Sequence, residues 1–282
     1  MNKHFIILVI LSFPISTCFS QTSVTESRIL SQYGIKEKKV QCILYNQKQE
    51  DSLNYLVFTS DFNKMRYALK EVRYKPDGKT DETTCKYRSD TLKIKGVEKT
   101  DGNIIRELER FYDEKGNLKS EVFTDNVRKT KVTRMFELNN YGKPVKEYSS
   151  NGSGSVLNGT FEYDNKRNLI RVNTVNKDEE ITSANIFEFD SNNNEIRYYS
   201  IKDGVKGHLT EKKYNKDNLL TEEDHVTSHA YKLLDIFGVE HHYSTGDKKV
   251  IEYQYDSRSL LVDQTEFING KMVSKLKFEY LK

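Results

Sequence analysis

The sequence predicts an all-β fold, an array of antiparallel β-hairpins that repeats about every 25 residues. Three observations support this class: the composition, a recurring aromatic position, and a recurring turn. The chain of 282 residues contains 18 Tyr and 14 Phe but no Trp and only 3 Pro. Many aromatic residues and few prolines favour strands. A hydrophobic content of 36% favours sheets with one solvated face over a thick core.

The aromatic marker is Tyr112, in the segment FYDEKGNLKSEV at 111–122. Equivalent positions follow one another at intervals of 25, 26, 25, 26, 25, 41 and 25 residues: Tyr87, Tyr112, Leu138, Tyr163, Phe189, Tyr214, Tyr255 and Tyr280. Self-similarity at a fixed period is the mark of a repeat architecture. The segment is therefore interpreted as scaffold, with Tyr112 as one rung of an aromatic ladder.

A second marker has nearly the same period but lies out of phase with the first. It consists of turn-forming pairs such as Asp101-Gly102, Asp203-Gly204 and Asn269-Gly270. Gly and Asn accept the positive φ of tight hairpins, and Asp and Asn bond locally to the backbone. Stretches of six to ten residues with alternating character separate the turns, which is strand length and strand period. Each unit is thus strand, turn, strand, turn, and the predicted product is a curled or twisted single sheet.

The repeats are expected to form a domain over residues 57–282, with an N-terminal cap segment at 21–56. Within the cap we expect a short helix over 23–32, ending near Gly34, and strands over 39–45 and 53–59. Repeat arrays need such a cap to cover the first hydrophobic edge. The interval of 41 residues marks an insertion near 222–247.

Residues 1–20 are typical of a secretory signal peptide. A basic start at Lys3 precedes an apolar run over 5–15, which is too short to span a bilayer. Cleavage is expected between Ser20 and Gln21, which predicts a secreted or periplasmic protein. The alternative is a lipoprotein anchored through Cys18, disfavoured by Thr17 just before that cysteine. No later segment is apolar enough to cross a membrane as a helix.

The charge balance argues against nucleic-acid binding. The chain has 45 Lys and Arg against 42 Asp and Glu, a net charge of +3, and the charges are interspersed along its length. A nucleic-acid-binding protein needs a strongly basic face. The pattern is typical of solvated strand faces.

The pattern aromatic-x-Tyr-Asp-x-x-x-Asn-Leu, seen at 161–169 and in variant form at 111–118 and 253–260, resembles the YD repeat of bacterial RHS-type proteins. The resemblance covers roughly residues 70–282. A weaker resemblance is to MORN-like hairpin repeats of exported or antitoxin-type bacterial proteins. Both imply arrays of β-hairpins, and neither implies catalysis.

The insertion is the main place where chemistry could lie, because it contains the histidines His225, His229, His241 and His242. His225 and His229 are spaced i, i+4, so on a helical turn they would share a face and could bind one metal ion. The opposing interpretation is a polar surface loop, since no known zinc motif is present. The sequence therefore predicts no metal, no cofactor and no catalytic residues, with these four histidines as the reserve candidates.

Two further sets of residues have competing interpretations. Cys42 and Cys85 could form a disulfide in an oxidising compartment, or remain two separate half-buried thiols. The recurring acids Asp113, Asp164, Asp190 and Asp256 could be calcium ligands, but each is better explained by its own turn.

The expected function is non-enzymatic: an exported β-repeat protein that presents a binding or structural surface to a protein or glycan. Rows of exposed Tyr alternating with Lys and Glu would suit such contacts. The alternatives are an immunity or antitoxin-like role, by analogy with the repeat families alone, and a metal-dependent enzyme centred on the inserted histidines.

Overall fold

The computed structural model describes residues 29–45, 51–64, 67–75, 77–89, 92–150, 152, 154–226, 231–234, 240–243 and 246–282. The predicted signal peptide, with Cys18 and the Ser20–Gln21 cleavage site, lies outside the described residues. So does most of the helix expected over 23–32, of which residues 29–32 form one helical turn.

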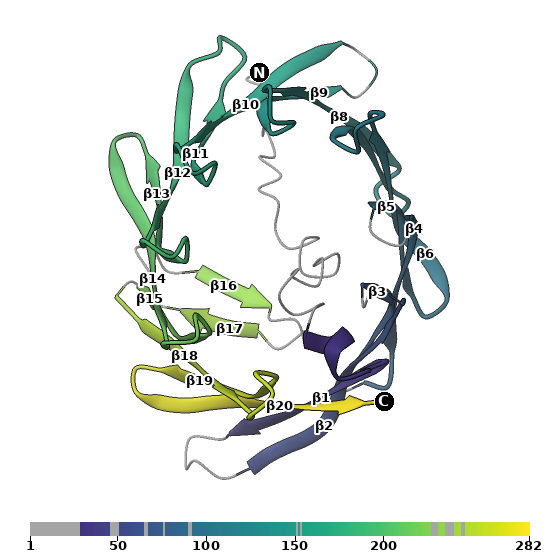
Figure 1. Cartoon of the computed structure of the whole chain (residues 1–282), viewed down its shortest axis with the longest axis vertical. Helices are drawn as coiled ribbons and strands as arrows, with labels where there is room; N and C mark the ends of the chain where they lie inside the picture. Colours follow the sequence, from purple (N-terminus) through teal and green to yellow (C-terminus); the bar gives the residue numbers. More distant parts are fainter. Residues whose placement is uncertain are drawn as a thin grey trace, which may run out of the picture.

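The strands follow one another as an antiparallel meander, as predicted, but the sheet closes on itself. Its strands are β1 (Glu37–Tyr45), β2 (Asp51–Phe62), β3 (Ala68–Tyr74), β4 (Thr80–Arg88), β5 (Leu92–Thr100), β6 (Asn103–Tyr112), β7 (Leu118–Asp125), β8 (Thr130–Leu138), β9 (Pro144–Ser150), β10 (Ser155–Tyr163), β11 (Leu169–Val175), β12 (Ile181–Phe189), β13 (Glu195–Lys202), β14 (Val205–Tyr214), β15 (Leu220–Val226), β18 (Lys248–Tyr255), β19 (Leu261–Ile268) and β20 (Lys271–Leu281). Each pairs with its neighbour along the chain, and β1 also pairs with β20. The result is an 18-stranded barrel, drawn as a ring in Figure 1.

Closure corrects two expectations. The open, curled sheet is wrong, because Lys38 pairs with Tyr280 and Cys42 with Leu276 along the seam. The segment over 21–56 does not cap an open edge, because β1 and the start of β2 are strands of the barrel wall. The physical reason is the same for both: a closed sheet leaves no edge to cover.

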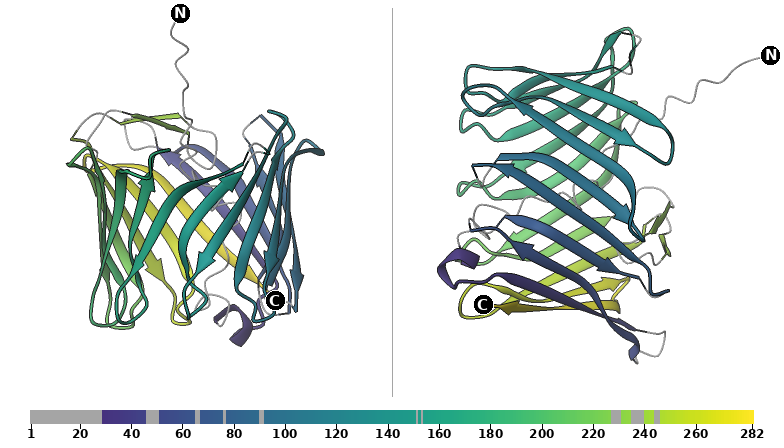
Figure 2. Two further views of the ribbon diagram at one scale, coloured as in Figure 1. Left: turned by 90° about the horizontal axis from the view of Figure 1, so that it is seen from above. Right: turned by 90° about the vertical axis from the view of Figure 1, so that its right-hand side faces the viewer.

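The insertion is shorter than predicted. Residues 222–226 belong to β15, and the segment that follows contains a separate two-stranded hairpin, β16 (Tyr231–Leu234) with β17 (Glu240–Tyr243). This hairpin lies at one end of the barrel, as the two views of Figure 2 show.

The turns that follow the repeat aromatic positions and the turns of the second marker lie at opposite ends of the barrel. One end, the turn rim, carries the five-residue turns at 113–117, 139–143, 164–168, 190–194, 215–219 and 256–260, together with the helical turn and the C-terminus. The other end, the hairpin rim, carries connections such as 101–102, 203–204 and 269–270 together with β16 and β17. The positions of both sets of turns match the predicted markers, but the hairpin rim also carries five-residue turns, at 75–79 and 176–180.

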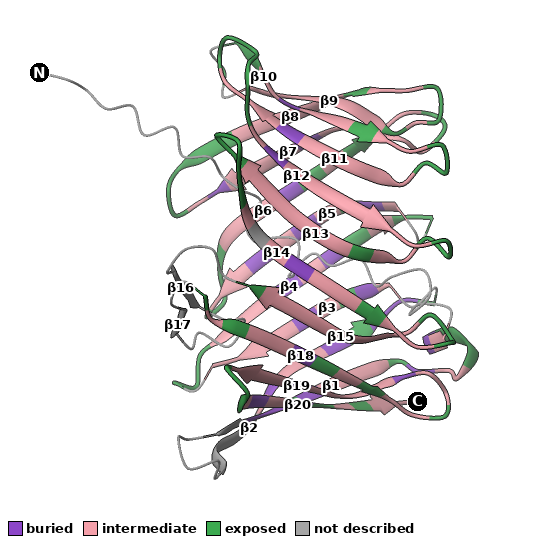
Figure 3. Cartoon of the chain, turned by 90° about the vertical axis from the view of Figure 1, so that its left-hand side faces the viewer, coloured by how far each residue is buried: buried purple, intermediate pink, exposed green. Residues whose placement is uncertain are grey.

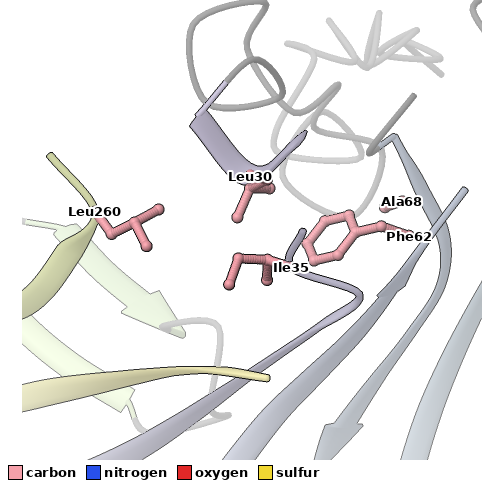
Figure 4. Packing of buried hydrophobic residues seen from close by; sticks show 5 residues of the cluster. All are labelled: Leu30, Ile35, Phe62, Ala68 and Leu260. Atoms are coloured by element: carbon pink, nitrogen blue, oxygen red, sulfur yellow. The ribbon is translucent and has the colours of Figure 1, made fainter. Parts of the chain in front are cut away.

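The buried residues form small clusters in place of a thick core. Figure 3 shows mostly half-buried strands, with exposed residues gathered at the turns. The largest cluster joins the helical turn to the wall through Leu30, Ile35, Phe62, Ala68 and Leu260 (Figure 4). Leu260 follows β18 and Ala68 begins β3. The cluster therefore bridges the part of the wall that runs from β18 through β19, β20, β1 and β2 to β3, and a bridge across a curved wall lies on its concave side. Since Tyr280 packs on this cluster, its side of the sheet is the inner face.

Candidate functional site

The repeated aromatic positions point to the inner face. Directly opposed residues of paired strands share a face, and the register carries the side of Tyr280 around the whole barrel to Tyr112, Tyr163 and Tyr214. These tyrosines are half-buried, so the expected rows of exposed Tyr are wrong.

Five of the six repeat tyrosines bond to the bulge of the preceding unit. A register shift lies directly before every marker position except Tyr280, for example between Phe111 and Tyr112. A bulge removes regular ladder partners from the backbone. The tyrosine of the next unit supplies a hydrogen-bond partner, because its hydroxyl donates to a backbone carbonyl near the start of the bulged strand. The O–O distances are 2.7–3.0 Å in the pairs Tyr87–Ala68, Tyr112–Lys93, Tyr163–Pro144, Tyr214–Glu195 and Tyr280–Leu261. The tyrosines are therefore structural links between units.

Two marker positions lack this hydroxyl, namely Leu138 and Phe189. Phe189 keeps the ring, whereas Leu138 has neither ring nor hydroxyl. At Leu138 the turn rim is hollowed between the turns 113–117 and 139–143, in an open depression of about 900 Å³. Its wall includes Tyr112, Leu138 and Tyr141. The hollow therefore coincides with the unit in which the repeat side chain is shortest.

The turns beside the hollow are held by Asx hydrogen bonds. Asp113 Oδ1 accepts the Asn117 backbone N–H at 2.8 Å, and Asp113 Oδ2 accepts the Asn117 side-chain amide at 2.9 Å. The amide of Asn117 donates this bond and holds the pKa of the Asp113 carboxyl below its usual range. Gly142 takes φ +74°, and a Cβ there would lie 2.0 Å from Asn117 Oδ1, so only glycine lets the two turns meet.

The other recurring acids play the same part, as the sequence predicted. Asp164, Asp190 and Asp256 each accept the backbone N–H four residues on, at 2.7, 2.8 and 3.0 Å. These local bonds confirm the interpretation as turn residues.

The inner wall also carries a buried polar cluster that sequence reasoning missed. Lys93 is 2% exposed and lies by Cys85 and Tyr87, while Glu71 is 8% exposed with Ser60 Oγ donating to it at 3.4 Å. Burial lowers the pKa of Lys93 and raises that of the Cys85 thiol. Burial also raises the pKa of Glu71 to about 7. A thiol held protonated is a weak nucleophile.

The described histidines of the predicted set lie in two separate sheets. His225 lies in strand β15, so the helical turn considered for His225 and His229 is not formed there. Its Nδ1 is 2.9 Å from Thr210 Oγ1, and its Nε2 is 3.3 Å from Glu223 Oε2. His229 lies outside the described residues, and His241 and His242 belong to β17. Within the described ranges, no three His, Cys, Asp or Glu side chains are grouped as metal ligands.

The structure does not bring Cys42 and Cys85 together. Cys42, in β1, packs with Val57 and Leu276, whereas Cys85, in β4, packs with Leu108. Strands β2 and β3 separate them, a lateral distance of about 14 Å at the usual strand spacing, which exceeds disulfide reach. Neither cysteine is part of a disulfide, so the disulfide considered from the sequence is not formed in this structure.

The outer face carries ion pairs around the barrel. The N–O distances lie between 2.5 and 3.7 Å, and the pairs are Lys70–Glu82, Lys95–Glu107, Lys146–Glu137, Arg171–Glu162, Arg197–Glu188, Arg197–Glu211, Lys213–Glu222, Lys248–Asp224 and Lys275–Asp263. Every one joins adjacent strands on the face opposite the repeat tyrosines.

In the described part of the chain, no helix has the length and apolar character of a membrane span.

Comparison with known proteins finds likeness only among solved structures. A porin-like protein from Bacteroides uniformis is 11% identical, with a TM-score of 0.46, covering 88% of this chain and 96% of that one. The TcdB2-TccC3-Cdc42 structure gives 10% identity and a TM-score of 0.33, and the Photorhabdus luminescens Tc holotoxin pore gives 11% and 0.33. This chain spans 13% of each of those two toxin chains. No protein-family model and no curated protein matches it.

Proposed function

We propose that this chain is an exported, non-enzymatic binding protein whose ligand occupies the hollow at Leu138 on the turn rim. The observation that carries the proposal is the position of the hollow, at the unit where the repeat tyrosine is replaced by a shorter side chain. The other repeat positions carry Tyr or Phe, whereas the hollow lies at Leu138, and concave surfaces with convergent polar groups are where ligands bind.

The side chains at the hollow support binding over catalysis. They include carboxylates, amides, ammonium groups and two tyrosines, but no Cys, His or Ser. The nucleophilic candidates Cys85 and Lys93 are buried in the wall, where burial keeps the thiol protonated. Asp113 is occupied by its own turn.

The variant Leu138→Tyr is expected to abolish binding without destabilising the barrel. The new ring fills the hollow, and its hydroxyl can donate to the Leu118 carbonyl, as Tyr112 donates to that of Lys93. Purified mature protein, probed on an array of oligosaccharides and peptides, should bind as wild type and fail as Leu138→Tyr. Its midpoint of thermal unfolding should be unchanged or higher.

Phe189→Tyr is the matched control, because it adds a hydroxyl at the equivalent position of another unit, away from the hollow. It should retain full binding on the same array. Equal binding by wild type and Leu138→Tyr would overturn the proposed site.

We further propose that the barrel works in water, since its outer face carries the ion pairs described above. A membrane barrel needs an outward apolar band about 25 Å tall, and Lys or Arg at its midplane costs about 2–4 kcal/mol. The mature chain is therefore expected to refold without detergent and to enter the aqueous phase on detergent phase separation. Folding only in the presence of micelles or lipid, checked by circular dichroism, would contradict this.

A further inference from the structure

We propose that the ligand of the hollow is a neutral oligosaccharide; this rests on the proposed function and names its ligand class. The first reason is charge. Asp113 and Glu114 face Lys115 and Lys119 around the same depression, two carboxylates against two ammonium groups. With Arg167 stacked on the Tyr141 ring, the site carries a small positive excess of mixed charges in place of a strongly basic or acidic surface, so phosphates and nucleic acids gain little there.

The second reason is the aromatic surface. The Tyr141 side chain is 62% exposed, and the Arg167 guanidinium lies 4.0 Å from its ring centroid. The cation–π contact holds the ring in place from the neighbouring turn. An exposed, positioned tyrosine ring offers a broad apolar surface with a polar tip, which fits the C–H face and hydroxyls of a pyranose.

The third reason is the hydrogen-bonding inventory. Asn139 accepts the backbone N–H groups of Tyr141 and Lys143, which orients its amide, and exposed Asn140 lies next to it at the hollow. Each amide carries both donors and acceptors. The Asn139 oxygen already accepts two backbone N–H groups, so Asn139 offers a ligand its NH2 donors, whereas the Asn140 amide offers a donor and an acceptor. Sugar hydroxyls also donate and accept, so a polyhydroxylated ligand can bond to both amides.

A peptide fits less well. Extended peptides commonly dock by adding a strand to a free sheet edge, and here β1 pairs with both β2 and β20. The hollow is open, and Leu138 is the only aliphatic residue among those that line it, so it lacks an enclosed aliphatic pocket that would anchor a peptide side chain.

Isothermal titration of the mature protein tests the inference, with neutral hexasaccharides of glucose, mannose and N-acetylglucosamine as probes. Oligogalacturonate and a polar hexapeptide serve as comparison ligands. At least one neutral probe should bind, and Tyr141→Ala should weaken it about tenfold or more, the loss of one stacking contact. Its affinity should change less than about twofold between low and high salt, because screening acts on charges.

Tyr199→Ala is the matched control. Tyr199 also stacks under a cation, with Lys206 Nζ 3.9 Å from its ring centroid, but it lies on the outer face. It should bind as wild type. Binding of only the uronate or the peptide, weakened by Tyr141→Ala, would overturn the saccharide class and leave the site standing. Failure of every probe would overturn the inference. Binding that both Tyr141→Ala and Leu138→Tyr leave intact would overturn the inference and the proposed site together.

Discussion

Replacing Glu71 by Gln is expected to stabilise the protein at alkaline pH by about 3 kcal/mol and to leave it unchanged at pH 4. Glu71 lies on the inner face of β3, where burial raises its pKa from 4.5 to about 7. Ser60, Lys38, Arg73 and Lys93 surround it, and burial outweighs their charges.

The direction follows from proton linkage. The folded-state pKa lies above the unfolded value, so the carboxyl contributes its full stability below about pH 4.5 and loses it as pH rises through 7. Each pH unit between the two values is worth about 1.4 kcal/mol. Gln stays neutral throughout and escapes this loss. Urea unfolding of wild type and Glu71→Gln from pH 4 to pH 8 should give curves that diverge with rising pH.

Glu82→Gln is the matched control on the next strand. Glu82 faces outward and lies 2.8 Å from Lys70 Nζ, and the hydrogen bond from Lys70 lowers its pKa. Removing that charge should destabilise the protein slightly at pH 8, within the 0–1 kcal/mol of an exposed ion pair. A Glu71→Gln effect that is the same at pH 4 and pH 8 would rule out an ionised carboxylate as the cause.

The repeat and its turns could be predicted because their signals are local. An Asx turn needs only an Asp or Asn and a residue that accepts positive φ, as at 113–117, where Gly116 has φ +84°. Alternating strands between such turns fix a meander. The bounds of β1 and β2 enclose the predicted strands for the same reason.

Closure could not be predicted, because it depends on contacts between the two ends of the chain. Pairing of Lys38 with Tyr280 has no local signature. Strand alternation assigns Tyr112 and Arg110 to one face, but only the curvature decides that this face is the inner one. The tyrosines were therefore expected to be exposed.

The candidate site was half visible in the sequence. Leu138 stands out as the break in the Tyr ladder. The sequence alone, however, does not distinguish a repeat that has merely lost its tyrosine from one whose missing ring leaves a hollow. The insertion attracted attention through its histidines, yet His225 turned out to lie in the wall strand β15. Buried Lys93 and Glu71 gave no signal, because charges alternate on solvated faces as well.

Replacing Leu260 by Ala is expected to lower the free energy of unfolding by about 3 kcal/mol, in the range of fully buried leucines. Leu260 is 2% exposed and packs in the cluster with Leu30 and Ile35, which join it to Phe62 and Ala68 (Figure 4). Truncation removes this bridge across the concave side of the seam strands β20 and β1, and leaves a cavity.

The matched control is Leu219→Ala, at the same fifth position of the turn 215–219. The backbone N–H of each leucine donates to the first residue of its turn at 3.0 Å, Asp256 for Leu260 and Asn215 for Leu219, so the turns themselves are equivalent. Leu219 is only half-buried and lies outside the cluster, and its loss should be about 1 kcal/mol. Urea unfolding measures both values, and amide exchange in β1 and β20 should accelerate in Leu260→Ala alone. Equal losses in the two variants would mean that the helical turn adds nothing to closure, and that the β1–β20 hydrogen bonds hold the barrel shut by themselves.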